Sequence, residues 1–540
     1  MKTLRKLIST ILLGAVFAFS ANAFVIENGR VAPAQSQPAG ASGEFKFDKR
    51  LSAARIDFTA EKGSKYAKWT LKRIVVSAPA EIAGNVKFHV TRNDIMLVQD
   101  AGLSRSIRLD VTGAAKIGNK PLPYNMTVYP AALGAGVLNI DYYVTDGKNT
   151  EILSHPVKIS SPVFEAGKTS VFSETVPADL QGWTSKPFVR DLDAIRAQVL
   201  SIAKRANIAS MQVGYTDNLG EVFVTVTNPD WFNANDTRKA WLREFDDSDI
   251  FQAAETGAMP FVYVVLKLVE NGTLDLDEPL CTYVPEILDR FSKGARAKAK
   301  TITARQCLQH ISCVKNGNGD INIGNAPGST YGESRNNYML LQWVVEELTG
   351  KSVEDLCSKA IFKPLKMANT SYKWLPVYAQ KAVSGYGGTD NPVNRPDWGE
   401  RNWVEPGTSL RTNATEFSAF LKWALAGGGL KQKTIDSMFE SKVHVAAPEY
   451  RRERMSQWRG LGWIVENNDE FGTIALHSGR NAQWRSTAMI FPERGETFCV
   501  FTDTANRINY YDALMDLFFA PKEPLACFGC GYLYPLDNRK

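Results

Sequence analysis

The sequence predicts a multidomain protein in which an all-β sandwich precedes a larger α/β domain. The chain has 540 residues, which is more than a single hydrophobic core usually serves. Residues 46–174 contain short alternating and β-branched runs that are punctuated by Gly and Pro. From residue 188 to residue 520, apolar residues at helical spacing alternate with strand-like segments. We therefore expect two domains that meet between residues 174 and 188.

Alternation of apolar and polar residues predicts the strands of the first domain. The segment 104–113 places Ile107, Leu109 and Val111 on one face. The segment 137–150 also alternates, and it contains an Asp-Gly pair that is typical of a hairpin turn. No segment of this region shows a convincing helical period, so the pattern favours a β-sandwich.

The N-terminus has the layout of a secretory signal peptide. Basic residues near Met1 are followed by an apolar run and then by an Ala-Asn-Ala sequence that ends at Ala23. We predict cleavage after residue 23 and export to the periplasm, the cell surface or the extracellular space. Residues 24–45 are rich in Ala, Gly, Pro, Gln and Ser, which predicts a linker. We expect no membrane span, because no later apolar run is long enough.

Charge and cysteine content exclude several classes of function. The net charge of +6 is small for this length, and the basic run 293–300 is typical of a solvated helix face, so we expect no nucleic-acid partner. Seven cysteines cannot all pair within one chain, and Cys527 and Cys530 form a single C-x-x-C in the tail 521–540. One such pair is weak evidence for zinc, so we predict no metal and no cofactor.

Five strand-like segments follow one another in the first domain: LKRIVVSAPAEIAGNVKFHV, GLSRSIRLDVTG, YNMTVYPAAL, VLNIDYYVTDGK and VFEAGKTSVFS. In the order of these segments the domain resembles the fimbrillin-like proteins of Bacteroidota. The resemblance implies a transthyretin-like sandwich that serves in adhesion or assembly. A plain spacer domain is the other interpretation.

Five segments of the second domain follow one another in a recognisable order: FQAAETGAMPFVYVVLKLVENGTLDLDEPLCTYVPEI, KTITARQCLQHIS, PGSTYGESRNNYMLLQWVVEELTGKSVEDLCSKAIFKPLKMANTSY, GTSLRTNATEFSAFLKWAL and LHSGRNAQWRSTAMIFPERGETFCVFTDT. In these segments the domain resembles the serine β-lactamase family in its broad sense, which includes class C β-lactamases, low-molecular-weight penicillin-binding proteins, esterases and D-aminopeptidases. The resemblance implies an antiparallel sheet flanked by helices, together with a helical subdomain.

The family acylates a serine that opens a buried helix, and a lysine one turn later assists in removing the serine proton. The shared segment 266–277 fixes the register of the match. It places Glu255 at the serine position and Ala258 at the lysine position. The resemblance therefore implies that both the nucleophile and its partner are replaced.

Two further motifs of the family lie later in the chain. The Tyr-x-Asn motif, which handles the proton and the substrate amide, falls on Glu333 and Arg335. The third motif, His-x-Gly, helps to form the oxyanion hole and is retained as His477-Ser478-Gly479. An ion pair between Glu255 and Arg335 across the site is one arrangement that this register suggests.

These replacements predict a pseudo-enzyme that binds a peptide, a peptidoglycan fragment or an envelope protein in the former substrate site. The alternative is an active hydrolase of the β-lactamase, esterase or D-Ala peptidase type with non-standard residues, such as Glu255 as a general base on water. A Ser-His-Asp triad that uses His310 or His477 is also open. A literal Ser-x-x-Lys at Ser201 lies in a different helix, and we interpret it as a chance match.

Overall fold

The computed structural model describes most of the chain from residue 52 onward. The described ranges are 52–79, 105–112, 115–128, 136–159, 168–231, 243–386, 403–445, 457–505 and 508–521, without residues 318, 469 and 482. Residues 164, 525 and 536 are also described, as is the backbone of the strands at 24–27, 30–33, 36–38, 86–90, 95–99 and 534–535. The predicted signal peptide, Cys527 and Cys530 lie outside the described residues.

Two β-sheets share the core of the first domain. The six-stranded sheet has the order β13 (Thr184–Pro187), β11 (Thr150–Ile159), β10 (Gly136–Thr145), β5 (Thr70–Ser77), β8 (Ser106–Thr112), β3 (Ser36–Pro38). The three-stranded sheet has the order β12 (Thr169–Val176), β4 (Ser52–Ala60), β9 (Leu122–Val128). Apolar side chains from both sheets form one buried cluster, so the predicted all-β domain is present in the described residues. Its likeness to fimbrillin-like proteins stays a prediction.

The alternation seen in the sequence corresponds to burial in the first domain. Ile107, Leu109 and Val111 of β8 all lie in the core. Every second side chain of β10 from Leu138 to Val144 is fully buried, and β10 pairs with β11 through the predicted Asp-Gly turn. Gly147 in this turn has a φ of 98°, which a residue without Cβ adopts readily.

The first domain extends beyond both predicted limits. A four-stranded sheet has the order β1 (Phe24–Glu27), β2 (Arg30–Pro33), β6 (Val86–Val90), β7 (Ile95–Gln99), so strands lie in the segment that we expected to be a linker. The expected end at residue 174 falls inside β12, and β13 follows it in the larger sheet. Trp183 explains this extension, because it is buried in the shared core and stacks on His155 with ring centroids 4.6 Å apart.

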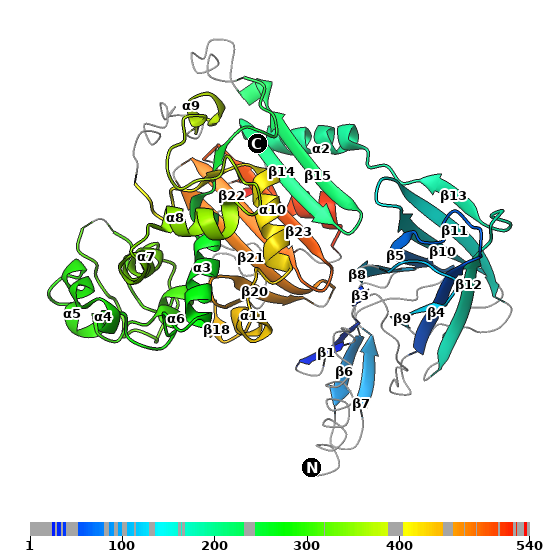
Figure 1. The fold of residues 1–540 in the computed structure, drawn as a ribbon, viewed down its shortest axis with the longest axis horizontal. Coiled ribbons are helices and arrows are strands. Elements are labelled where there is room, and N and C mark those ends of the chain that lie inside the picture. The colour runs from blue at the N-terminus through cyan, green and yellow to red at the C-terminus, as the bar shows by residue number, and fades with distance from the viewer. Residues whose placement is uncertain are drawn as a thin grey trace.

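An antiparallel eight-stranded sheet forms the centre of the second domain (Figure 1). Its order is β15 (Gly220–Thr227), β14 (Ser210–Asp217), β23 (Glu496–Thr502), β22 (Trp484–Phe491), β21 (Gly472–Asn481), β20 (Ile464–Asn468), β19 (Gln457–Arg459), β18 (Val443–His444). One face packs on α2 (Leu192–Arg205) and α12 (Tyr511–Phe519). The other face packs on α3 (Ala258–Glu270) and α10 (Ala414–Leu425).

The helix α3, which begins three residues after Glu255, is deeply buried in the second domain. All nine residues from Ala258 to Leu266 in α3 are buried. The helix ends at Asn271, and Gly272 continues the turn with a φ of 78°. The buried helix that the resemblance implies after residue 255 is therefore present. A short 3₁₀ helix, η3 (Ala254–Gly257), precedes α3 and carries Glu255.

The remaining elements of the second domain include both helices and short strands. They are η1 (Pro229–Trp231), β16 (Phe251–Gln252), α4 (Leu280–Tyr283), η4 (Pro285–Arg290), α5 (Arg296–Ala299), α6 (Ala304–Leu308), α7 (Asn336–Thr349), α8 (Val353–Cys357), η5 (Ser358–Phe362), α9 (Tyr378–Lys381), β17 (Arg411–Thr412), α11 (Gln432–Met438), β24 (Ile508–Asn509) and β25 (Tyr534–Pro535). Among the described residues, no helix is long and apolar enough to cross a membrane.

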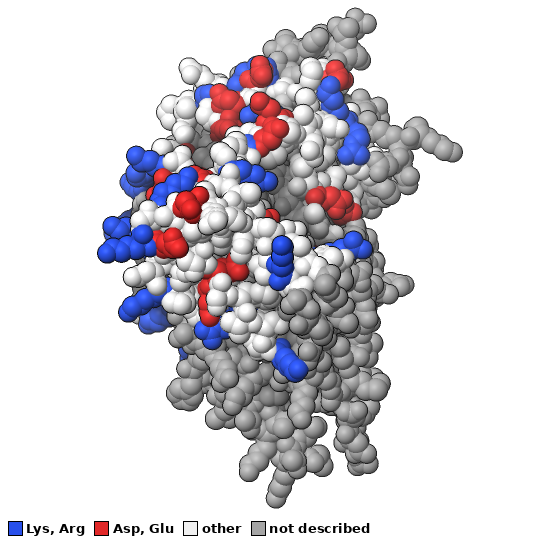
Figure 2. Space-filling view, turned by 90° about the vertical axis from the view of Figure 1, so that its right-hand side faces the viewer, with Lys and Arg blue, Asp and Glu red and all other residues white. Residues whose placement is uncertain are grey.

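Charged side chains are distributed over the surface without a large area of one sign on the face that Figure 2 shows. Acidic and basic residues lie interspersed there among uncharged ones. This distribution agrees with the small net charge of +6. The five cysteines in the described ranges are free thiols.

Candidate functional site

The retained glycine of the third motif allows η3 to lie directly against the central sheet. A Cβ on Gly479 would lie 2.5 Å from the backbone nitrogen of Glu255 and 2.6 Å from Oγ of Ser486. Ser486 and Thr256 each donate a hydrogen bond of 2.6 Å to the carbonyl of Ala253. The structure therefore brings Glu255 and the His-x-Gly strand into contact, and the hydroxyl of Thr256 is occupied by the backbone.

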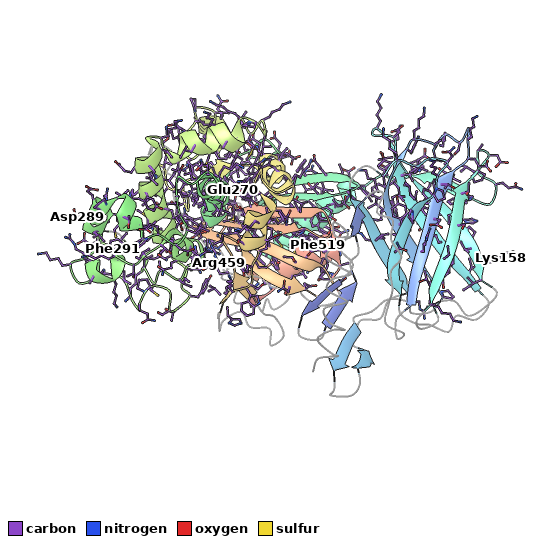
Figure 3. The ribbon with its side chains drawn as sticks, turned by 60° about the horizontal axis from the view of Figure 1, so that its bottom comes forward. Lys158, Glu270, Asp289, Phe291, Arg459 and Phe519 are labelled. Carbon is purple, nitrogen blue, oxygen red and sulfur yellow. The ribbon has the colours of Figure 1, made fainter. Side chains whose placement is uncertain are left out.

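Arg459 supplies a buried cation to this region. Ala258, at the position where the resemblance implies a lysine, is fully buried at the start of α3. Arg459 of β19 has no exposed surface, and Figure 3 shows it inside the second domain. Its guanidinium donates to the hydroxyl of Tyr338 at 2.9 Å and to Oε1 of Glu333 at 3.3 Å.

Glu333 combines an ion pair with Arg459 and access to solvent. Its Oε2 lies 3.0 Å from Nδ1 of His310, and its Oε1 accepts a hydrogen bond from Tyr331. Desolvation opposes ionisation, but His310 and Arg459 outweigh it and hold the pKa of Glu333 well below its usual range. The side chain is nevertheless 41% exposed. Glu333 is thus an anchored carboxylate that a ligand can reach.

His477 belongs to the same network but does not carry a charge. The hydroxyl of Tyr338 lies 3.3 Å from Nε2 of His477, which connects Arg459 through Tyr338 to the third motif. Burial and the nearby Arg459 charge lower the pKa of His477 to about 3. His477 therefore stays neutral near pH 7. The hydroxyl of Ser478 lies 3.3 Å from that of Thr487 on β22.

Glu255 is the carboxylate whose protonation changes near neutral pH. Its Oε2 accepts a hydrogen bond from the backbone N–H of Arg480. Burial raises its pKa to about 7, and the charge of Glu333 adds to this effect against the Arg480 hydrogen bond. Two carboxylates with pKa values displaced in opposite directions are typical of sites that move protons. We name Glu255, His310, Glu333, Tyr338, Arg459 and His477 the carboxylate cluster.

Replacement of Glu255 by Gln is expected to reduce the dependence of stability on pH. The folded state holds the Glu255 proton up to about pH 7, whereas the unfolded chain releases it near 4.5. Stability is therefore present below pH 4.5 and is lost as pH rises through 7. With allowance for partial solvent exposure, we expect this contribution to be about 2 kcal/mol. Urea unfolding at pH 4.5 to 8.5 measures it.

An exposed glutamate provides the matched control for this measurement. Glu286 lies on the surface, and Glu286→Gln should leave the pH profile of wild type unchanged. Profiles of the Glu255→Gln and wild-type proteins that run parallel over this range would show that Glu255 does not titrate there.

The structure does not bring all the candidate residues together. Arg335 forms an ion pair with Glu405, Nη1 to Oε1 3.4 Å, and Glu255 instead bonds the Arg480 backbone. Ser201 is exposed on α2, which packs on β15 at the edge of the sheet. Three strands lie between β15 and β21 in the sheet, so Ser201 is not part of the carboxylate cluster.

Backbone conformation around the carboxylate cluster is unusual at three non-glycine residues. Ala254, His310 and Cys313 have φ values of 47°, 54° and 60°, in the left-handed region that favours glycine. Cys313 stands where the family resemblance implies a glycine, and it keeps the conformation that a glycine would adopt without strain. Left-handed non-glycine residues are enriched at functional sites, which agrees with the position of the cluster.

The sequence did not identify Arg459 or Tyr338 as site residues. The signal for Arg459 was a charged residue inside the apolar run QWRGLGWIV, where burial requires a partner. Its partners Glu333 and Tyr338 precede it by more than 100 positions. Among the described residues, no group of three or more His, Cys, Asp or Glu side chains is arranged to hold a metal ion.

Comparison with known proteins gives matches to the second domain. Residues 261–514 match the family model described as Beta-lactamase, a range that begins just after Ala258. The solved structure of a D-stereospecific amidohydrolase from Streptomyces sp. is 16% identical, with a TM-score of 0.47 over 60% of this chain and 99% of that one. A D-alanine carboxypeptidase AmpC from Burkholderia cenocepacia is 13% identical, with a TM-score of 0.48 over 61% of this chain and 97% of that one.

Two curated relatives match parts of the same domain. Protein flp of Staphylococcus aureus (strain N315) is 23% identical over 252 residues, which are 43% of this chain and 48% of the relative. The putative penicillin-binding protein PbpX of Bacillus subtilis (strain 168) is 28% identical over 123 residues, 20% of this chain and 29% of the relative. The chain thus spans about half the length of protein flp and less than a third of the length of PbpX. The second domain is therefore similar to the Beta-lactamase family over residues 261–514, which are just under half of the chain.

Proposed function

We propose that this protein is an exported, non-acylating member of the family that binds a ligand at the carboxylate cluster. The observation that carries the proposal is the pair Glu255 and Ala258 at the start of the buried helix α3. A carboxylate on η3 and a methyl group one turn later offer neither a hydroxyl nucleophile nor an amine base. Loss of a nucleophile alone typically costs several orders of magnitude in rate.

The second and third motifs support the same proposal. Glu333 replaces the tyrosine that would pass the proton, and its charge is held by Arg459 and His310. His477 is buried and neutral, so it supplies no positive charge for a substrate carboxylate. We propose a peptide, a peptidoglycan fragment or an envelope protein as the ligand class. The first domain would act as an adhesion module or as a spacer.

Covalent labelling tests the proposal directly. We expect no label when the full chain is incubated with a fluorescent penicillin or with a fluorescent serine-reactive phosphonate, because no activated serine lies in the carboxylate cluster. An active class C β-lactamase under the same conditions is the positive control. Labelling that persists in Ser201→Ala and disappears in a variant of a cluster residue would refute the proposal.

A second candidate function is hydrolysis by activated water. The pKa of Glu255 near 7 favours it, because a general base works best when its pKa lies near the working pH. Such an enzyme would hydrolyse a D-Ala dipeptide or a nitrophenyl ester with a rate that rises through pH 7. The activity would be lost in Glu255→Gln and kept in Glu286→Gln. Rates equal to those of buffer at every pH would exclude this alternative for these substrates.

A further inference from the structure

The two domains are joined by ionic contacts between buried side chains. Arg73 of β5 contacts Oδ1 of Asp110 at 2.7 Å within the first domain. Its Nη2 reaches Oδ2 of Asp217 at 2.9 Å and Oδ1 of Asn218 at 3.1 Å, both in the second domain. Asn218 in return donates to the carbonyl of Lys72. Asp110 and Asp217 are both almost fully buried, so these contacts are shielded from water.

A second arginine crosses the same boundary next to Arg73. Arg108 of β8 pairs with Asp110 at 2.6 Å and with Glu496, the first residue of β23. Glu496 is fully buried and also contacts Arg494 at 2.9 Å and the hydroxyl of Tyr215 at 3.2 Å. Paired charges of this kind tolerate the loss of a partner poorly, because an unpaired buried charge is costly.

The connection between the domains is short and takes part in the same contacts. Residues 188–191 are all that separates β13 from α2. The backbone N–H of Phe188 donates to the carbonyl of Thr150 at 2.8 Å, and Arg190 pairs with Asp217. A short connection fixed at both ends leaves little freedom for one domain to rotate about the other.

The interdomain contacts lie at one end of β14 and β23, and the contact of Glu255 with the central sheet lies at the opposite end of these strands, whereas His477 is level with Gly214 in the middle of β14. Asp217 is the last residue of β14 and Glu496 is the first residue of β23. The backbone N–H of Arg480 donates a hydrogen bond to Glu255. Arg480 pairs with Arg485, and Arg485 pairs with Thr502, the last residue of β23, so this contact lies at the opposite end of these strands. The length of β14 from Met211 to Asp217 corresponds to about 20 Å.

The pictures agree with this arrangement. In Figure 1 the first domain lies beside the second, next to the ends of β14 and β15. In Figure 3 Phe519 lies on the side of the second domain toward the first, whereas Arg459 lies farther away.

We infer that the orientation of the first domain is fixed: the ionic contacts of Arg73, Arg108 and Arg190 hold it rigidly at the end of β14 and β23 that lies away from Glu255. None of the described residues of the first domain belongs to the cluster. Interdomain interfaces within a chain commonly permit motion, and here the buried ion pairs and the short connection oppose it. The inference concerns the arrangement of the domains and stands whether or not the cluster binds a ligand.

Trypsin cleavage after Arg190 and small-angle scattering test this inference on the full chain. Arg190 is engaged with Asp217, so we expect the bond after it to resist trypsin in wild type and the scattering to fit one domain orientation. Arg73→Leu with Arg108→Leu removes the contacts of both arginines to the second domain. We expect this double variant to be cut after Arg190 at least about tenfold faster and to scatter as a mixture of orientations, since 1.4 kcal/mol of coupling corresponds to a factor of ten.

The control is Arg55→Leu, which removes an arginine that pairs with Asp57 at 2.8 Å within the first domain. It should keep the wild-type pattern. Circular dichroism of each variant separates a changed orientation from an unfolded domain, and Arg108→Leu alone serves if the double variant does not fold. The inference would be overturned if trypsin cut wild-type protein after Arg190 as fast as at exposed lysines. It would also be overturned if the folded Arg108→Leu variant or the folded double variant kept the wild-type cleavage rate and scattering.

Discussion

Replacing Arg459 with methionine is expected to lower the free energy of unfolding by about 2–3 kcal/mol, less than for a fully buried ion pair because the Glu333 side chain is 41% exposed. Arg459 has no exposed surface, and its guanidinium holds both Tyr338 and Glu333. Methionine keeps the apolar volume but leaves the Glu333 carboxylate without this cation. Urea unfolding followed by tryptophan fluorescence measures the loss.

Two further variants show whether the charge or the shape of Arg459 matters. Arg459→Lys keeps a positive charge but not the planar fork that reaches two partners, so its stability should be intermediate. Combining Arg459→Met with Glu333→Gln removes the uncompensated carboxylate and should recover part of the loss. An exposed ion pair typically contributes up to about 1 kcal/mol. An Arg459→Met variant whose free energy of unfolding lies within about 1 kcal/mol of wild type would therefore contradict the ionic role.

Replacing Gly479 with alanine is expected to lower the free energy of unfolding by about 3 kcal/mol, at the upper end of the usual range for overpacking. The new Cβ would lie 2.5 Å from the backbone nitrogen of Glu255 and 2.9 Å from Cβ of Ala254. Neither atom belongs to a flexible side chain, so η3 must move away from β21. Thermal unfolding measures the loss, and hydrogen exchange of residues 254–257 reports the displacement.

Gly294→Ala is the matched control, since no atom lies within 4 Å of the Cβ that it would gain. It should be close to wild type in stability and in exchange. If Gly479→Ala were as stable as Gly294→Ala and its η3 exchanged as slowly as in wild type, the close contact between η3 and the central sheet would be wrong.

Local patterns predicted the elements of both domains well. The alternation in β8 and β10 and the helix and turn from Ala258 to Gly272 are present in the structure. The limits of the first domain were predicted less well. The sequence near residue 24 has a linker-like composition, although its backbone pairs in strands. Trp183 lies beyond the expected end of the domain and belongs to its core, directly before strand β13 of the larger sheet.

The candidate site was predicted in part. Glu255 and Gly479 lie in close contact, and Glu333 lies close enough to influence the pKa of Glu255. The ion pair found for Arg335 is with Glu405, a residue that sequence reasoning did not consider. Side-chain partners of this kind depend on loops whose course no local period encodes.

The sequence alone determined the order of the domains, the strand and helix patterns, and the absence of Ser and Lys at residues 255 and 258. These features follow from residue type and from periods of two or 3.6 residues, which a short window contains. Only the tertiary structure decided which charges meet. Arg459 pairs with Glu333 across 126 positions and Arg73 with Asp217 across 144, because burial in a shared interior selects partners by space and not by sequence.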